Sequence, residues 1–190
     1  MEVLAADEKN DVFVYIATNE KLESLKFGTN RRQRFAETVL DRFVVAGGSL
    51  RHCRLFDAID FETTKSAVIV GVGLYGGEKG SAHDVTLEVL QGDKILIRTV
   101  RRMVSVGDKA PIRVDFETAV WIRQNLRYTL RVTMLGPKTW WGYKGVATYD
   151  LEGCGTGIVS FYQSAVAEKN NGSNIQFGQI PQLIFVVPSK

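Results

Sequence analysis

Hydrophobic and polar residues alternate along much of the chain after residue 55, and this alternation predicts β-strands. The clearest example is residues 126–134, where apolar side chains occupy the even-numbered positions and arginine or threonine the odd-numbered ones between them. Residues 85–89 and 112–116 follow the same period of two. Because successive side chains of a strand point to opposite faces, each segment is expected to bury one face and expose the other.

Residues 67–75 are instead a continuous apolar run rich in valine and isoleucine, which predicts a strand buried on both faces. The run stops at Gly76 and Gly77, a backbone break that permits positive φ. Further along, residues 91–93 (Gln-Gly-Asp) separate the alternating segments 85–89 and 95–99, a pattern that predicts a hairpin.

The segment before residue 46 is ambiguous. Phe35, Val39 and Phe43 are spaced four apart, which permits a short helix, whereas residues 43–45 could equally begin a strand. We expect residues 41–190 to form one domain, and residues 1–40 to be an N-terminal extension that packs on it or serves as a linker.

The chain has 190 residues, of which 45% are hydrophobic and 24% charged, as expected for one globular domain. Many short predicted strands separated by glycine-rich turns indicate an all-β fold, and more specifically an antiparallel β-sandwich or barrel. There is no internal repeat at a fixed period and no low-complexity linker.

Charge and cysteine content narrow the class of protein. The net charge of +3 is weak for a nucleic-acid binder, so the basic stretches 31–54 and 98–102 are expected to be solvated surface, and we expect no nucleic-acid partner. Cys53 and Cys154 are expected to be reduced thiols. The polar first eleven residues do not form a signal peptide, and no apolar run is long enough to span a bilayer. We therefore expect a cytoplasmic protein without membrane insertion.

The sequence offers little for catalysis. His52 neighbours Cys53, but adjacent strand residues point to opposite faces, so the two are not expected to form a catalytic pair. His83 follows a glycine-rich turn and is expected to lie in a loop. No metal-ligand spacing and no phosphate-binding glycine motif occur. Scattered carboxylates leave a glycosidase-like enzyme as a third hypothesis. We expect no catalytic residue, no metal and no cofactor.

Three loop-like segments combine glycine with aromatic or amide side chains: residues 74–80, 136–145 and 170–181. Adjacent tryptophans in an extended chain cannot both enter one core, so one of Trp140 and Trp141 should be partly exposed. Exposed aromatic side chains on rigid loops are typical binding anchors. The alternative is that one tryptophan packs in the core and the other covers an edge strand. The predicted partner-binding residues are Tyr75, Gly76, Trp140, Trp141, Tyr143, Lys144, Asn170, Asn171 and Gln179.

These segments also carry a family resemblance. Residues 70–77 (Val-Gly-Val-Gly-Leu-Tyr-Gly-Gly), residues 135–145 with Trp141-Gly142-Tyr143-Lys144-Gly145, and residues 170–185 with Gly178-Gln179-Ile180-Pro181 resemble successive motifs of the PHR domain. Arg42-Phe43 and residues 57–61 (Asp-Ala-Ile-Asp-Phe) resemble its opening pattern. The resemblance covers roughly residues 41–187. It does not reach residues 1–40, and Gly47-Gly48-Ser49 stand where family members often have a tryptophan-glycine element.

The resemblance implies a jelly-roll-like antiparallel β-sandwich that recruits substrate or cofactor proteins to a ubiquitin ligase and is not itself catalytic. PHR domains occur in Pam/Highwire-type ubiquitin ligases of neurons and in BTB–BACK adaptors of cullin-RING ligases, which implies a cytoplasmic and neuronal setting. The partner, the oligomeric state and the parent protein stay open. A carbohydrate- or small-ligand-binding sandwich is the alternative, and it predicts a concave aromatic platform.

Overall fold

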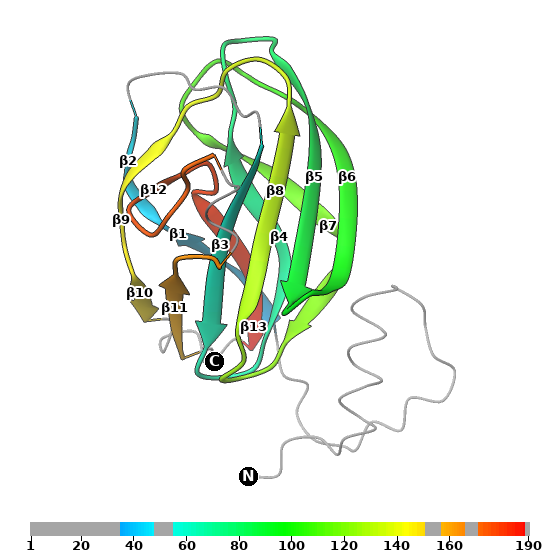
Figure 1. Cartoon of the computed structure of the whole chain (residues 1–190), viewed down its shortest axis with the longest axis vertical. Helices are drawn as coiled ribbons and strands as arrows, with labels where there is room; N and C mark the ends of the chain where they lie inside the picture. Colours follow the sequence, from blue (N-terminus) through cyan, green and yellow to red (C-terminus); the bar gives the residue numbers. More distant parts are fainter. Residues whose placement is uncertain (1–34, 48–54, 151–156, 166–170, 189–190) are drawn as a thin grey trace.

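The structure of the chain is a computed structural model that describes residues 35–47, 55–150, 157–165 and 171–188. Every strand pair described is antiparallel (Figure 1). The strands are β1 (Phe35–Asp41), β2 (Phe43–Ala46), β3 (Phe56–Thr63), β4 (Ala67–Tyr75), β5 (Ala82–Gln91), β6 (Lys94–Val104), β7 (Pro111–Ile122), β8 (Tyr128–Leu135), β9 (Gly142–Gly145), β10 (Thr148–Asp150), β11 (Ile158–Tyr162), β12 (Phe177–Gly178) and β13 (Gln182–Pro188).

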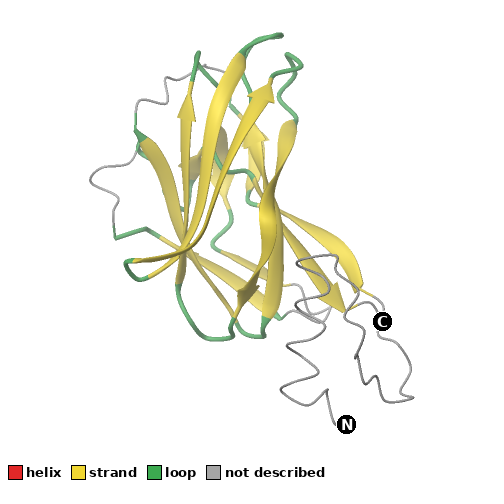
Figure 2. Ribbon diagram, turned by 90° about the vertical axis from the view of Figure 1, so that its right-hand side faces the viewer, coloured by secondary structure: helices red, strands yellow, loops and turns green. Residues whose placement is uncertain are grey.

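Two large sheets and one small sheet make up the fold. A four-stranded sheet has the order β1-β13-β4-β7, and a six-stranded sheet has the order β10-β11-β3-β8-β5-β6. A three-stranded sheet of order β12-β9-β2 lies beside them, and Figure 2 shows the strands gathered into layers. The predicted all-β, antiparallel β-sandwich is confirmed.

The hydrophobic core lies between the two large sheets. Ile69 and Val72 of β4 and Val114 of β7 belong to the same buried cluster as Leu87 of β5 and Leu130 of β8. Along β8 the burial alternates from Tyr128 to Met134, as the period-two pattern predicted. Burying apolar surface at roughly 25 cal/mol per Å² is the main favourable term that holds two such sheets together.

Strand β4 and the hairpin also match the expectation from sequence. Strand β4 covers the predicted residues 67–75 and is buried along almost its whole length. The β5–β6 hairpin turns at Gly92, whose φ of 57° lies in the left-handed region that glycine adopts without strain. The pattern of nine apolar residues without alternation therefore identified a strand that is covered on both sides.

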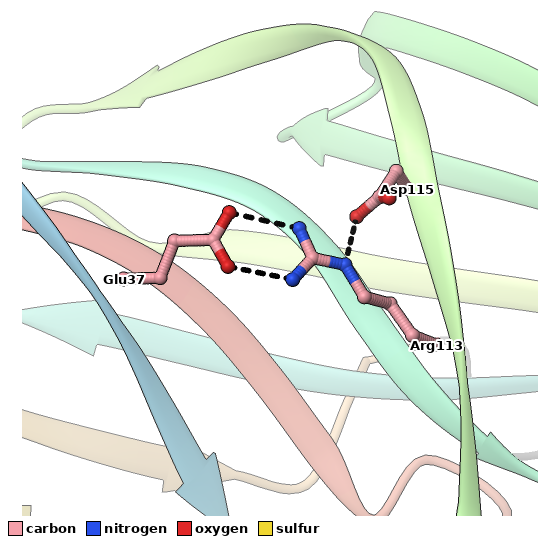
Figure 3. A network of polar contacts seen from close by, with 3 residues as sticks. All are labelled: Glu37, Arg113 and Asp115. Atoms are coloured by element: carbon pink, nitrogen blue, oxygen red, sulfur yellow. Dashed lines mark hydrogen bonds and ion pairs between the residues drawn. The ribbon is translucent and has the colours of Figure 1, made fainter.

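Glycines in β4 explain how its outer side is covered. A side chain at Gly71 would collide with the carboxylate of Asp115, and one at Gly73 would collide with Gln182. Figure 3 shows Arg113 extending from β7 across β4 to Glu37 of β1, with Asp115 beside it. The Val-Gly-Val-Gly motif therefore leaves room for side chains that cross the outer face of the four-stranded sheet.

The ambiguous segment forms two strands, not a helix. Strand β1 pairs with β13 over its full length, from Phe35 opposite Pro188 to Asp41 opposite Gln182. Residues 35–40, which the sequence analysis placed in the N-terminal extension, are thus part of the four-stranded sheet.

Candidate functional site

The structure brings the three predicted loop segments together. The amide of Trp140 donates a hydrogen bond to the carbonyl oxygen of Gly76 at 2.8 Å, which joins the first segment to the second. Gln179 Nε2 donates to the carbonyl oxygen of Tyr75 at 2.5 Å, which joins the first to the third. Strands β9 and β12 join the second to the third. In Figure 1 the chain passes from β8 over the top of the sandwich to β9, which lies beside β2 and β12.

Arg42 is the polar centre of this assembly. It separates β1 from β2 and is almost completely buried. Its Nη1 donates to the carbonyl oxygen of Ile180 at 2.9 Å and its Nη2 to that of Asn174 at 3.1 Å. The guanidinium carbon lies 4.8 Å from the ring centre of Phe43 and 4.9 Å from that of Phe161. Arg42 thereby attaches the third segment to the sandwich.

Burial opposes the charge on this guanidinium and lowers the pKa of Arg42 to about 9, although attraction from Asp57 and Tyr75 acts in the other direction. Asp57 of β3 is buried as well, which raises the pKa of its carboxyl against the opposing hydrogen bonds and the charge of Arg42. Ser173 Oγ donates to Asp57 Oδ1 at 2.5 Å and Asn171 Nδ2 donates to Asp57 Oδ2 at 3.0 Å. Buried charges need such partners because an unpaired one costs several kcal/mol.

Above this polar layer the three-stranded sheet presents a row of apolar side chains. Val45 of β2 is paired with Tyr143 of β9, and Tyr143 is paired with Phe177 of β12. The rings of Tyr143 and Phe177 meet edge to face with centroids 5.8 Å apart. Val45 is 41% exposed and Phe177 is 42% exposed, while Tyr143 is half-buried. We call these three residues the aromatic stripe.

The two tryptophans divide as their adjacency predicted. Trp141 is buried, and Trp140 is half-buried. The ammonium of Lys109 lies 4.8 Å from the ring centre of Trp140. Lys144 is exposed and holds a left-handed backbone conformation with φ of 57°.

Three of the remaining predicted binding residues lie inside the domain. Tyr75, Gly76 and Gln179 are buried, and a side chain at Gly76 would collide with Ser105. Asn171 is half-buried and forms two hydrogen bonds with the backbone of Leu55. Its Oδ1 accepts from the Leu55 amide at 2.9 Å, and its Nδ2 donates to the Leu55 carbonyl oxygen at 3.1 Å. Asn170 lies outside the described residues. These groups hold the loops in place, so Trp140, Tyr143 and Lys144 are the predicted residues that reach the surface.

Two exposed residues of the stripe are absent from the predicted set. Phe177 falls inside the third segment, but the binding residues predicted there are amide side chains. Val45 falls in the ambiguous segment, and only its pairing with Tyr143 shows that it shares a face with the aromatic residues. The period-two pattern of so short a strand is too brief to assign the exposed face from sequence.

The enzyme and sugar-binding hypotheses can be compared with the side-chain clusters and hollows of the described residues. Among the described residues no three histidine, cysteine, aspartate or glutamate side chains gather as a metal site. Two hollows in the described part of the chain are each lined by one carboxylate, Glu88 or Asp93, rather than a pair. Phe56 is the one aromatic residue lining them, so neither forms an aromatic platform.

His83 differs from its predicted place. It is a buried residue of strand β5, not of a loop. The expected thiols and His52 lie outside the described residues. Within the described part of the chain, no helix has the length and apolar character that a membrane crossing requires.

Comparison with known proteins gives a consistent family. The PHR domain family model matches residues 41–186. BTB/POZ domain-containing protein 6-A of Danio rerio is 28% identical over 190 residues, covering 97% of this chain and 34% of the relative. BTB/POZ domain-containing protein 3 of Mus musculus is 30% identical over 188 residues, covering 96% of this chain and 34% of the relative.

The chain spans about a third of the length of these curated relatives. The matches cover nearly all of the chain, so they include most of residues 1–40, for which the sequence analysis found no counterpart in the family pattern. One solved structure, titled as that of infectious bursal disease virus Gx strain, has 9% identity and a TM-score of 0.27 over 92% of this chain and 47% of that chain, which is too low to bear on the fold.

Proposed function

This chain belongs to the PHR domain family, and from this premise we propose that it is a non-catalytic module that binds a protein partner for a ubiquitin-ligase component longer than itself. Two observations support a protein-interaction role. The relatives are named for a BTB/POZ domain, and this chain matches about a third of their length. The best candidate for the contact surface is the aromatic stripe.

The aromatic stripe has the physical properties of a binding anchor. Tyrosine and phenylalanine bury large areas with little loss of side-chain freedom, and aromatic residues dominate the energetics of many interfaces. Strand pairing fixes Val45, Tyr143 and Phe177 in one row, so a partner meets a preformed surface. The buried Arg42 and the half-buried Asn171 hold the segments beneath it.

Exposed lysines occur in the second segment and next to Trp140. Lys144 adjoins Tyr143, and Lys138 and Lys109 lie exposed in the loops before β9 and β7. Such charges act mainly on the rate of association with an acidic partner and on the choice of partner. We therefore propose that the partner presents an apolar patch bordered by acidic residues.

We propose further that the role of this contact is to deliver a substrate or cofactor protein to a ligase in the cytoplasm. Support comes from the resemblance to domains of Pam/Highwire-type ligases and BTB–BACK adaptors, together with the BTB/POZ names of the relatives. Imaging of a fluorescently tagged full-length parent protein tests the location.

The experiment that tests the contact surface compares captured proteins quantitatively by mass spectrometry. The bait is the full chain as wild type, as Tyr143→Ser/Phe177→Ser, or as Val106→Ser/Leu126→Ser, where the last pair is exposed and distant in sequence from the stripe. All three must melt at similar temperatures. We expect a defined set of proteins to be lost with the stripe variant alone, and each to bind the purified wild-type chain directly in a calorimeter.

Capture of the same proteins by the wild type and the stripe variant would refute the assignment of the surface. Loss with both variants would point to non-specific apolar association. If the captured proteins accumulate ubiquitin only when the intact parent protein is present, the ligase role is supported as well.

A further inference from the structure

A second surface, on the outer face of the six-stranded sheet, has the features of a binding site. Here a hollow of about 370 Å³ opens between strands β3, β8, β5 and β6. Its lining residues are Phe56, Thr86, Glu88, Arg98, Val100, Arg131 and Thr133. None of them belongs to strands β2, β9 and β12, which carry the aromatic stripe.

A buried carboxylate with two arginines forms one side of the hollow. Glu88 is only 3% exposed. Its Oε1 accepts from Arg98 Nε at 2.7 Å and from Arg98 Nη2 at 2.6 Å, and its Oε2 accepts from Arg131 Nε at 2.5 Å. Burial alone would raise the pKa of Glu88, but the hydrogen bonds from both arginines lower it. The carboxylate is therefore charged at neutral pH, and the trio carries a net charge of +1.

The arginines keep donors for another acceptor. A guanidinium carries five N–H groups in a planar fork. Within the described part of the chain, Arg131 donates to Glu88 through Nε, and the two terminal nitrogens of Arg131 remain for another acceptor. The side chain of Arg98 is 60% exposed. Phe56 supports Arg131, whose guanidinium carbon lies 5.6 Å from the ring centre.

Apolar side chains adjoin these charges. Strand pairing places Val100, Thr86, Thr133 and Phe56 in one row across the sheet, directly beside the row of Arg98, Glu88 and Arg131. Val100 is 59% exposed, and Leu135, the next outward residue of β8 after Thr133, is 60% exposed. The surface thus combines a cationic hollow with an exposed apolar border.

We propose that this hollow binds an aspartate or glutamate side chain of an extended peptide segment, with an apolar residue of the same segment on Val100 or Leu135. One carboxylate neutralises the net charge of the trio, and arginine forks match carboxylates in geometry. Phosphate fits less well because its second charge would face Glu88 without compensation. A sugar would lack a stacking platform, since Phe56 is the single aromatic residue lining the hollow.

This inference does not depend on the proposed role of the aromatic stripe. One hydrogen bond nevertheless connects the third segment to the hollow: the backbone amide of Asn171 donates to the carbonyl oxygen of Phe56 at 2.9 Å. The stripe variant leaves every lining residue of the hollow unchanged, so the two proposals can fail separately.

The test begins with a displayed library of random heptapeptides selected on the full wild-type chain. Sequences are counter-selected against Arg98→Gln, a variant that leaves Arg131 to pair with Glu88. We expect enriched peptides to contain aspartate or glutamate with an apolar residue two positions away, the spacing of side chains on one face of a strand. Enrichment without an acidic position, or no enrichment, would overturn the proposal.

The strongest peptide is then synthesised with its acidic residue and with the matching amide. We expect the amide version and the Arg98→Gln chain each to weaken binding on the order of tenfold, and the arginine Nε–H signals of Arg98 and Arg131 to shift in NMR spectra. The matched control is Arg113→Gln, which removes an exposed arginine paired with two carboxylates on the other sheet and should bind as wild type.

Two further ligands separate the remaining sources of a signal. Inorganic phosphate and glucose are each titrated at millimolar concentration against the same NMR signals. Shifts with phosphate alone would make the hollow an anion subsite without a peptide, and shifts with glucose alone would make it a sugar site. Either outcome, or equal binding by the amide peptide, contradicts an acidic-peptide site.

Discussion

Asn171 Nδ2 donates a hydrogen bond to Asp57 Oδ2 at 3.0 Å, although the two residues lie 114 positions apart in the chain. The same amide also donates to the carbonyl oxygen of Leu55, and its oxygen accepts from the Leu55 amide. One side chain therefore holds the start of the third segment to the start of strand β3. The family motif in which Asn171 stands has, at this position, a structural role.

Replacing Asn171 with alanine should destabilise the domain by about 1–3 kcal/mol, because the backbone of Leu55 and the carboxylate of Asp57 lose partners. Chemical denaturation monitored by tryptophan fluorescence measures the change. The control is Gln176→Ala, whose side chain is exposed and should alter stability by less than about 0.5 kcal/mol. Equal stability of both variants would mean that the hydrogen bonds of Asn171 to Leu55 and Asp57 do not stabilise the domain.

Replacing Arg42 with methionine should cost about 3–5 kcal/mol, the range found when one member of a buried charged network is removed. Asp57 would keep Ser173 and Asn171 but lose the opposite charge, and two carbonyl oxygens would lose their donor. Urea unfolding gives the value, with Arg102→Met, an exposed arginine, as the control. A loss below about 1 kcal/mol would mean that Arg42 does not anchor the third segment.

Stability should fall as the pH drops below about 6.5, and His83 should account for part of the loss. The ring is buried, its Nε2 lies 3.2 Å from the carbonyl oxygen of Pro137, and its Nδ1 has no partner among the described residues. Burial lowers the pKa of His83 below its ordinary 6.5, so the unfolded chain binds the proton more readily than the folded one. Melting temperatures from pH 8 to pH 5 should decline less steeply for His83→Gln than for wild type. Parallel curves would exclude His83 as the source.

A methyl group at Gly145 should disrupt the three-stranded sheet, because its Cβ would overlap the carbonyl oxygen of Ile175. We expect Gly145→Ala to lower the free energy of unfolding by several kcal/mol. We also expect the fluorescence of the loop tryptophans to differ from that of the wild type. Gly92→Asn is the matched control, since that position has a φ of 57° and open space, and asparagine tolerates this conformation. Wild-type stability of Gly145→Ala would show that the loop backbone moves freely enough to accept the methyl group.

The ion-pair cluster in Figure 3 should matter little for stability. Arg113 pairs with Glu37 at 2.6 Å and with Asp115 at 2.7 Å, but all three side chains are about half exposed. Exposed pairs contribute roughly 0–1 kcal/mol because water already solvates the charges. Arg113→Gln should therefore change the unfolding free energy by no more than about 1 kcal/mol, and less in 1 M salt. A larger loss would indicate that the crossing of β4 is a structural requirement.

Several elements of the fold could be predicted because their information is local. Residues 67–75, the β5–β6 hairpin and the alternation along β8 follow from the period of apolar side chains and from one glycine turn. The segment at 34–45 could not be assigned, since four-residue spacing of apolar side chains suits a helix and β1 exists only through its pairing with β13. Pairing between Phe35 and Pro188, at opposite ends of the domain, leaves no mark in a short window of sequence.

The predicted site shows the same division. Glycine and aromatic motifs identified three segments that do meet, yet motif membership could not separate the buried Gln179 and Trp141 from the exposed Lys144. A residue that holds a loop and a residue that contacts a partner can stand side by side in the same motif. Phe177 joined Tyr143 only when β12 paired with β9.

By itself, then, the sequence determined the all-β class, several central strands and the segments that form the loops, because these depend on periodicity or on nearby turn residues. The family followed from the resemblance of its motifs. The tertiary structure alone decided that Arg42 and Asp57 are buried beneath those loops, that Val45, Tyr143 and Phe177 share one face, and that Glu88 lies between two arginines. These arrangements arise from register between strands distant in the chain, and register is set by the packing of the whole sandwich.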